Sequence, residues 1–274
     1  MSTTLNLAVL QLPIRFSKIA DNISTMQSML AQHMAEHPDT EAILLPELWT
    51  TGFYPQPLSD YADSDGQSIK KLYSKLAQKH HIYIIGGSVI TKTNDKYYNT
   101  SYAFAPDGKL LTTYNKIHLF SYAGEDQYFT PGDSLTTFTI KSIKCGIIIC
   151  YDLRFPELAR KLALENIDLL FLPAAWPQKR LMHWDTLLRA RAIENQIYVA
   201  ACNGITRYRE DGNQLGGHSV ILDPWGQELA KASDKDATSD KPSGQIITAQ
   251  LDTSTLTSIR STINVFQDRR PHLY

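Results

Sequence analysis

The alternation of short apolar runs with longer amphipathic segments constrains the fold of this chain more than any other feature of its sequence. Apolar runs of this length are typical of buried β-strands, and the amphipathic segments have the spacing of helices that cover a sheet. The predicted strands cover residues 5–10, 42–45, 82–90, 98–104, 145–149, 168–172, 197–201, 218–222 and 245–251. The predicted helices cover residues 19–35, 68–79, 155–165 and 181–196. This order predicts an α/β fold.

Several of the predicted strands are apolar at every position, as in the Ile-Ile-Ile of residues 147–149 and the Leu-Leu-Phe-Leu of residues 169–172. Strands of this kind are covered on both faces. Other strands are joined by short turns such as Pro106-Asp107-Gly108, which predicts a hairpin. Two packed sheets with helices outside them, a four-layer α/β/β/α sandwich, fit this mixture. An ordinary doubly wound sheet fits the alternation of helices and strands almost as well.

No internal repeat, low-complexity tract or linker divides the 274 residues, so we expect a single domain over residues 1–274. The most loop-like stretch, residues 232–243, predicts an exposed connection between strands. A net charge of −1 disfavours a general nucleic-acid binder, and the apolar runs are too short to cross a bilayer. The N-terminus has the pattern of a first strand rather than of a signal peptide. We therefore expect a cytoplasmic protein that binds neither nucleic acid nor membrane.

The three cysteines are too few, and odd in number, for a disulfide framework. The sequence contains no CxxC pair, and its eight histidines show no HExxH spacing, so we expect no metal site. No cofactor is expected either. One cysteine is therefore free to act as a nucleophile.

Cys150 ends the apolar run CGIIIC and is followed by YDLRFPELAR, which has the pattern of a helix. A strand that leads through a sharp turn into a helix carries a side chain to the carboxyl edge of the sheet, where α/β proteins bind ligands. Backbone N–H groups at such a helix start can stabilise a developing negative charge. From the residues alone, Cys150 fits either a nucleophile or a structural cysteine of the core. Cys202 ends a similar strand without a helix after it, and Cys145 is expected in the core.

Three charged residues are further candidates. Glu47 directly follows the apolar run of residues 42–46, where burial suits a general base; a helix cap or surface loop is the alternative. Lys116 lies among apolar and aromatic residues in YNKIHLF. A buried ammonium there would need an anion, such as Glu47 or a tetrahedral oxyanion, whereas most lysines lie on solvated faces. Glu125, in AGED, fits an exposed acidic loop as well as a site.

Taken together, three segments resemble the nitrilase superfamily of carbon–nitrogen hydrolases: LLPELWTTGF around Glu47, YNKIHLF around Lys116 and CGIIICYDLRFPELAR around Cys150. Their order along the chain matches the superfamily, and the resemblance extends from the first strand to the C-terminal DRRPHLY. It implies the four-layer sandwich and places a second glutamate of the site at Glu125. It also implies a homodimer, in which we expect the tail, from about residue 260 to residue 274, to contact the partner subunit.

The residues after the nucleophile indicate an amide substrate. Nitrilases usually carry Cys-Trp-Glu there, whereas this chain has Cys150-Tyr151-Asp152. The segment PAAWPQKRLMHWDTLLRARAIENQ, residues 173–196, is most similar to the bacterial omega-amidase branch, whose members hydrolyse the terminal amide of 2-oxoglutaramate and 2-oxosuccinamate. Amidases of the same superfamily that act on deaminated glutathione or N-carbamoyl substrates are the nearest alternatives. A catalytically silent interaction protein on this fold, or acyl transfer to an amine, are more distant ones.

The resemblance implies that Cys150 attacks the amide carbonyl while Glu47 takes the thiol proton, and that the acyl group passes through a thioester to water. Lys116 and the backbone N–H of Tyr151 would stabilise the oxyanion. Glu125 would orient Lys116 or the substrate amide.

A substrate carboxylate is best matched by arginine, because the planar guanidinium donates two parallel hydrogen bonds. Arg154 and Arg180 are the candidates, although Arg154 also fits a salt bridge at a helix start or a subunit contact. Phe53 and Trp176 are expected to form pocket walls, with a place in the core as the alternative.

Overall fold

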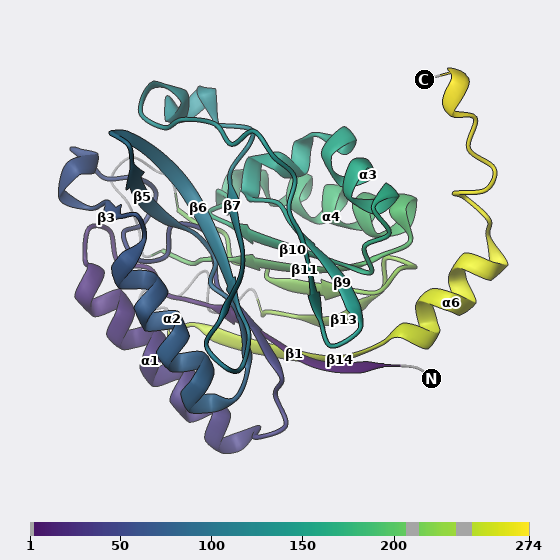
Figure 1. The fold of residues 1–274 in the computed structure, drawn as a ribbon, viewed down its shortest axis with the longest axis horizontal. Coiled ribbons are helices and arrows are strands. Elements are labelled where there is room, and N and C mark those ends of the chain that lie inside the picture. The colour runs from purple at the N-terminus through teal and green to yellow at the C-terminus, as the bar shows by residue number, and fades with distance from the viewer. Residues whose placement is uncertain (1–2, 207–213, 234–242, 274) are drawn as a thin grey trace.

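In the computed structural model, which describes residues 3–206, 214–233 and 243–273, two β-sheets lie face to face between two pairs of helices (Figure 1). Helices α1 (Ile19–Glu36) and α2 (Gln67–His80) cover the outer face of one sheet. Helices α3 (Pro156–Leu164) and α4 (Leu181–Asn195) cover the outer face of the other. The α/β/β/α sandwich expected from the sequence is confirmed, and the single doubly wound sheet is excluded.

The first sheet has eight strands in the described part of the chain, in the order β14-β1-β2-β4-β6-β5-β3, with β7 also paired to β6. β1, β2 and β4 run parallel to one another, whereas β14 and β6 are antiparallel to their neighbours β1 and β4. The strands are β1 (Thr4–Gln11), β2 (Ala42–Leu44), β3 (Asp63–Ser64), β4 (Tyr83–Ile85), β5 (Val89–Thr93), β6 (Lys96–Phe104), β7 (Leu110–Asn115) and β14 (Gln245–Asp252).

The second sheet has six strands within the described residues, in the order β13-β12-β11-β10-β9-β8. Its centre, β9, β10 and β11, is parallel. The strands are β8 (Thr137–Ile140), β9 (Ile143–Ile147), β10 (Leu169–Ala174), β11 (Tyr198–Asn203), β12 (Val220–Leu222) and β13 (Glu228–Lys231). Each sheet therefore presents an edge formed by the carboxyl ends of parallel strands, which is where ligands bind in such folds.

Alternate side chains of β1 belong to different layers. Leu5, Leu7 and Val9 lie in the core between the sheets, whereas Ala8 and Leu10 lie in the core against α1 and α2. This is the period-two geometry of a strand that is covered on both faces, and it explains why the predicted strands are apolar throughout.

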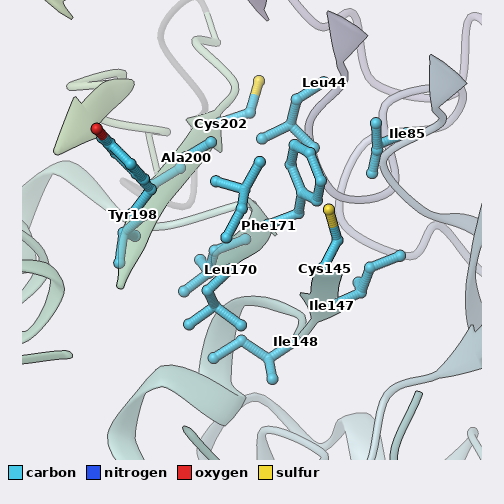
Figure 2. Close-up of a cluster of buried hydrophobic side chains, with 14 of the residues drawn as sticks. Leu44, Ile85, Cys145, Ile147, Ile148, Leu170, Phe171, Tyr198, Ala200 and Cys202 are labelled. Atoms are coloured by element: carbon cyan, nitrogen blue, oxygen red, sulfur yellow. The ribbon is translucent and has the colours of Figure 1, made fainter. Parts of the chain in front are cut away.

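The core between the sheets joins residues that are far apart in the sequence. Figure 2 shows Leu44 and Ile85 of the first sheet facing Cys145 and Phe171 of the second. Cys145 is therefore a core residue, as the sequence predicts. The packing of these side chains fixes the position of the carboxyl edge of the first sheet relative to that of the second.

The single strand predicted over residues 82–90 is wrong, because the chain forms two strands there, β4 and β5. Between them Gly87 has a φ of +66°, and a Cβ at this position would lie 2.0 Å from the carbonyl oxygen of Pro46. Only glycine fits this approach. The Ser88 N–H then donates to the same carbonyl at 3.1 Å, so the break fixes the loop that follows β2.

Three strands and one α-helix were not expected from the sequence: β3, β8, β13 and α6 (Thr253–Thr262). The short β3 and the partly exposed β13 and α6 lack a continuous apolar pattern, which hides them from periodicity arguments. β7 pairs with β6 across the Pro106-Asp107-Gly108 turn, which confirms the predicted hairpin. Most of the predicted loop over residues 232–243 lies outside the described residues.

The C-terminal segment contacts the sandwich through α6 and the residues just after it: Arg260 pairs with Asp168 at 3.0 Å, and the guanidinium of Arg160 lies 5.1 Å from the ring centre of Phe266. After β14 the chain forms α6, and the following residues run along the side of the molecule away from α1 and α2 (Figure 1). Among the helices of the described ranges, none combines the length and the apolar character needed to cross a membrane.

Candidate active site

Cys150 lies at the turn that the sequence predicts. β9 ends at Ile147, Cys150 begins a short 3₁₀ helix (Cys150–Arg154), and α3 follows from Pro156. The backbone φ of Cys150 is +46°, in the left-handed region that strains a residue with a side chain. Backbone strain of this kind is enriched at active sites, where it holds a side chain in a required orientation.

Glu47 lies just beyond β2, at the carboxyl edge of the first sheet, and is completely buried. Its backbone N–H donates to the carbonyl of Ala174 at 3.3 Å, and its Oε2 accepts from the N–H of Ala175 at 2.8 Å. The residue therefore bridges the edges of the two sheets. The alternatives of a helix cap or a surface loop are excluded.

Lys116, just after β7, is buried between two carboxylates. Its Nζ lies 2.8 Å from Oε1 of Glu47 and 2.8 Å from Oε2 of Glu125, and both glutamates are fully buried. Glu125 is held in turn by the backbone N–H of Phe120, which donates to its Oε2 at 2.7 Å. Solvated positions for Lys116 and Glu125 are therefore excluded, and Glu125 orients the lysine.

The charges of this cluster set the protonation state of the nucleophile. Burial, followed by the negative charge of Glu47, raises the pKa of the Cys150 thiol well above its usual value, and the Lys116 ammonium offsets only part of this. The thiol is therefore protonated at neutral pH, and it would need a base in order to act as a nucleophile. Burial alone would lower the pKa of Lys116, but Glu125 and Glu47 outweigh it and hold that pKa well above its usual value. Lys116 thus remains a cation.

Cys150 and Lys116 line a pocket of about 350 Å³ with largely aromatic walls. The charged side chains of the lining are Lys116, Arg154 and Arg180; within the described residues no carboxylate contributes to it. The pocket therefore favours a negatively charged ligand. The remaining lining residues are Phe16, Phe53, Tyr54, Phe120, Tyr122, Ala123, Tyr151, Ala175, Trp176, Pro177 and Leu215.

The two arginines lie against aromatic rings. The guanidinium of Arg154 is 4.7 Å from the ring centre of Trp176, and that of Arg180 is 5.0 Å from the ring centre of Tyr122. Burial lowers the pKa of Arg154, and repulsion from Arg180 adds to this effect. In the part of the chain that the structure describes, no carboxylate forms a salt bridge with Arg154. Its Nη1 and Nη2 lie 3.4 and 3.3 Å from Nδ1 of His183, a neutral or cationic partner, so the charge of Arg154 is not neutralised by these contacts.

Every residue that the sequence predicted for substrate binding lies at this pocket. Phe53 and Trp176 form its walls, and the Nζ of Lys116 is 6.0 Å from the ring centre of Phe53. The ring of Tyr151 also lines it, packed 4.9 Å from the ring of Phe120. The oxyanion role of the Tyr151 backbone N–H stays a prediction.

Sequence reasoning missed Asn99 and Ala175, which both donate to the carboxylate of Glu47. Asn99 Nδ2 donates to Oε1 of Glu47 at 2.8 Å and to Oε1 of Glu125 at 3.1 Å. An asparagine inside a strand, where this residue type is depleted, was the signal that could have revealed it. Ala175 acts through its backbone N–H, which no side-chain pattern reports.

Asp152 was noted only as a mark of the amidase branch, yet it ties the lysine loop to the nucleophile turn. Its buried carboxylate accepts from the N–H of Ile149 at 2.9 Å, the N–H of His118 at 2.8 Å and the hydroxyl of Tyr114 at 2.7 Å. Tyr114 and His118 flank Lys116, and Ile149 directly precedes Cys150. Asp152 therefore fixes the spacing of those two groups.

The other two cysteines take no part in the site. The thiol of Cys145 donates to the carbonyl of Ile143 at 3.4 Å, and that of Cys202 donates to the carbonyl of Leu10 at 3.1 Å. Both are completely buried, and burial raises the pKa of each. Within the described ranges, no three His, Cys, Asp or Glu side chains are placed to hold a metal ion.

Comparisons with known proteins show similarity over nearly the whole chain. The family model described as carbon–nitrogen hydrolase matches residues 6–261. The 2-oxoglutaramate amidase of Bacillus subtilis (strain 168) is 38% identical over 268 residues, which cover 98% of each chain. Omega-amidase NIT2 of Homo sapiens is 36% identical over 281 residues, covering 99% of this chain and 97% of that protein. The crystal structure of Saccharomyces cerevisiae Nit3, a member of branch 10 of the nitrilase superfamily, matches with a TM-score of 0.87 at 31% identity, covering 97% of each chain.

The substitution Lys116→Met tests the buried cluster, because it leaves two carboxylates together without a cation. We expect it to lower the free energy of unfolding at pH 7 by about 3–5 kcal/mol in chemical denaturation. As a control, Lys144→Met removes a lysine whose partner Glu165 lies 3.9 Å away at the surface, and should cost less than about 1 kcal/mol.

The loss should depend on pH. In Lys116→Met one carboxyl takes up a proton on folding, so its stability rises as pH falls from 7 towards 5. In the unsubstituted protein the raised pKa of Lys116 contributes stability that is complete below the usual lysine pKa and is lost only as pH rises above it. The difference in free energy of unfolding between Lys116→Met and the unsubstituted protein should therefore be smaller at pH 5 than at pH 7. If Lys116→Met and Lys144→Met lowered the free energy of unfolding equally, the buried ion cluster would not have the stabilising role assigned to it.

Proposed function

Because this chain belongs to the carbon–nitrogen hydrolase family, we propose that it is an omega-amidase, which converts the terminal amide of a small oxo acid such as 2-oxoglutaramate or 2-oxosuccinamate to carboxylic acid and ammonia. The observation that carries this proposal is a buried Glu–Lys–Glu cluster next to Cys150, at a pocket whose charged lining is entirely cationic.

Acylation begins from the protonated thiol. As the sulfur of Cys150 bonds to the amide carbon, its proton passes to Glu47, because the raised thiol pKa makes unassisted ionisation costly. The carbonyl oxygen becomes an oxyanion, which the Lys116 ammonium and the Tyr151 N–H stabilise. Glu47 then returns the proton to the amide nitrogen, the C–N bond breaks and ammonia leaves. A thioester on Cys150 and an ionised Glu47 remain.

Deacylation uses the same groups. Glu47 takes a proton from water as the water oxygen attacks the thioester carbonyl, and Lys116 again stabilises the oxyanion. When the C–S bond breaks, the sulfur of Cys150 recovers the proton from Glu47 and the carboxylic acid leaves. The net reaction consumes one water for each amide. Glu125 touches no reacting atom in this scheme and acts by holding Lys116.

The cationic lining supports a substrate that carries a carboxylate. Lys116 is committed to the oxyanion, so the two remaining cations, Arg154 and Arg180, are the groups left to bind a carboxylate at the other end of the substrate. Guanidinium groups suit this role because they donate pairs of parallel hydrogen bonds. This arrangement favours an oxo-acid amide over a neutral aliphatic amide. Deaminated glutathione and N-carbamoyl substrates remain the alternatives, since both also carry carboxylates.

The substitution Cys150→Ala should abolish ammonia release from 2-oxoglutaramate and leave the thermal unfolding midpoint close to that of the unsubstituted protein. Glu47→Gln should slow acylation by about 10²–10⁴-fold, the contribution typical of a general base. Mass spectrometry after a pulse of substrate should find the acyl adduct on Cys150 only in proteins that keep Glu47. Full turnover by Cys150→Ala, or rapid acylation in Glu47→Gln, would show that the nucleophile or the base lies elsewhere.

The substitutions Arg154→Gln and Arg180→Gln should each reduce kcat/KM for 2-oxoglutaramate by about 10–100-fold, since each removes a charge-assisted hydrogen bond. Most of the change should appear in KM. The kcat/KM for the uncharged pentanamide should change little, because this amide has no carboxylate to bind. Lys179→Gln is the matched control, as it removes an exposed neighbouring cation that does not line the pocket. Parallel losses for the charged and uncharged amides would contradict carboxylate recognition.

We further propose that two copies form a homodimer in which the tail after α6 contacts the partner subunit. Apolar side chains are exposed on α3 and α4 and in the tail: Leu164 (42%), Met182 (72%), Ile193 (50%) and Leu273 (63%). Analytical ultracentrifugation of the full chain should give a dimer, and a chain ending at residue 262 should dissociate at lower concentration. A full-length monomer at micromolar concentration would refute the proposal. The cytoplasmic location stays a prediction, supported by three free cysteines.

A further inference from the structure

Asn99, on β6, contacts both carboxylates of the cluster. It is 1% exposed, and its Nδ2 donates to Oε1 of Glu47 at 2.8 Å and to Oε1 of Glu125 at 3.1 Å. Lys116 Nζ contacts the same two oxygen atoms, at 2.8 and 3.1 Å. The amide thus stands beside the ammonium as a second donor shared by the two acids.

The charge balance of the cluster explains why a second donor is needed. Two carboxylates and one ammonium leave a net charge of −1 in a site where all three side chains are fully buried. A buried carboxylate that lacks donors gains a proton, because burial penalises its charged form. Glu47 and Glu125 each receive one further backbone N–H, from Ala175 and Phe120 respectively. Asn99 supplies a donor to both acids at once.

The other half of the amide shows that Asn99 is retained for its donors. Its Oδ1 is buried and has no hydrogen-bond partner among the described residues. An unpaired buried acceptor is unfavourable. Rotating the amide would not relieve it, because the oxygen would then face two carboxylates. The orientation is therefore dictated by the need of those two groups for N–H donors.

The backbone of Asn99 has a role separate from that of its side chain, so a substitution can test the side chain without removing the backbone contact. Its carbonyl accepts from the Lys116 N–H at 2.9 Å, so the strand holds the lysine segment whatever side chain occupies position 99. A substitution that preserves the strand therefore removes the donor to the carboxylates and leaves the position of Lys116 largely intact.

We propose that Asn99 is a positioning residue whose two hydrogen bonds hold the carboxylates of Glu47 and Glu125 beside Lys116, so that Glu47 can accept the proton of Cys150. The proposal rests on the assignment of Glu47 as the base under the proposed function. Loss of the amide should let the cluster take up a proton at higher pH, which would disable the base while Lys116 and Cys150 remain in place.

Lys116, Cys150 and Tyr54 face the two acids, and none of these three groups changes charge between pH 5 and 8. Lys116, from the segment after β7, stays a cation, and Cys150, from the second sheet, stays a thiol. Tyr54 faces Glu125, and burial, followed by the charge of Glu125, raises its pKa to about 12. Asp126, beside Glu125, also acts on Tyr54 and is exposed. A shift of the acid limb in an Asn99 variant would thus report the buried carboxylates.

The test measures two pH profiles from pH 4.5 to 8.5 in the full chain. The first is kcat/KM for 2-oxoglutaramate. The second is the rate at which iodoacetamide alkylates Cys150, located by mass spectrometry, which needs no substrate. In Asn99→Leu, which removes both donors at similar volume, the acid limb of each profile should move up by about one pH unit. At pH values below both acid limbs the rate of the variant should be about tenfold lower than that of the unsubstituted protein, while the plateau at higher pH changes less.

Two further variants separate positioning from stability. Asn99→Gln keeps an amide and should return the acid limb towards its original position. Asn195→Ala removes a fully buried amide that donates to the carbonyl of Arg191 on α4, on the outer face of the second sheet, and should lower the unfolding temperature without moving either acid limb.

An unmoved acid limb in Asn99→Leu, or a loss uniform across pH, would overturn the proposal for Asn99. If the unsubstituted protein is alkylated with a clear acid limb but releases no ammonia from any of the amides, the proposed function fails instead. The role of Asn99 is then decided by the alkylation profile.

Discussion

One ammonium held between two buried carboxylates is the interaction on which the rest of the site depends. Alone in this interior, Lys116 would lose a proton, and Glu47 or Glu125 would gain one, because burial penalises every charged form. Together, at 2.8 Å, each keeps the others charged. Under the proposed mechanism, the ionised Glu47 then serves as the base, and the ammonium stabilises the oxyanion. Neither group could serve the reaction without the other.

The fold supplies this interaction by bringing the carboxyl edges of two different sheets together. Glu47 follows a strand of the first sheet, Cys150 follows a strand of the second, and the hydrogen bonds of Glu47 to Ala174 and Ala175 connect the two edges. Close packing between the sheets keeps this spacing, since cores of this density deform little. Gly87 also helps to position Glu47, because any larger residue at position 87 would displace the loop that leads to Glu47.

The sequence predicts the parts of this arrangement that leave a pattern, and misses those that act through the backbone or a single amide. Apolar runs reveal the strands, and the residue after each run reveals Glu47 and Cys150 as candidates. Lys116 and Glu125 became convincing only through resemblance, because a lone lysine or glutamate has no periodic signature. Periodicity could not show the break at Gly87, since apolar residues flank it on both sides. Asn99 and Asp152 matter through the groups they contact, and contacts between distant segments are a property of the folded chain.

The cluster also explains how one site can hold a carboxylate base and still attract an anionic substrate. Of its members, Lys116 lines the pocket, whereas Glu47 and Glu125 lie behind it and are fully buried. A ligand entering the pocket therefore meets Lys116, Arg154 and Arg180 rather than the two acids. Because Lys116 lines the pocket and the two acids do not, a ligand lies nearer to the ammonium, whose attraction offsets part of the repulsion from the carboxylates behind it. Glu47 then acts on the substrate by way of the Cys150 proton, at the one point where sulfur, carboxylate and ammonium meet. Separating the base from the binding surface in this way allows the pocket to select for negative charge without weakening the base.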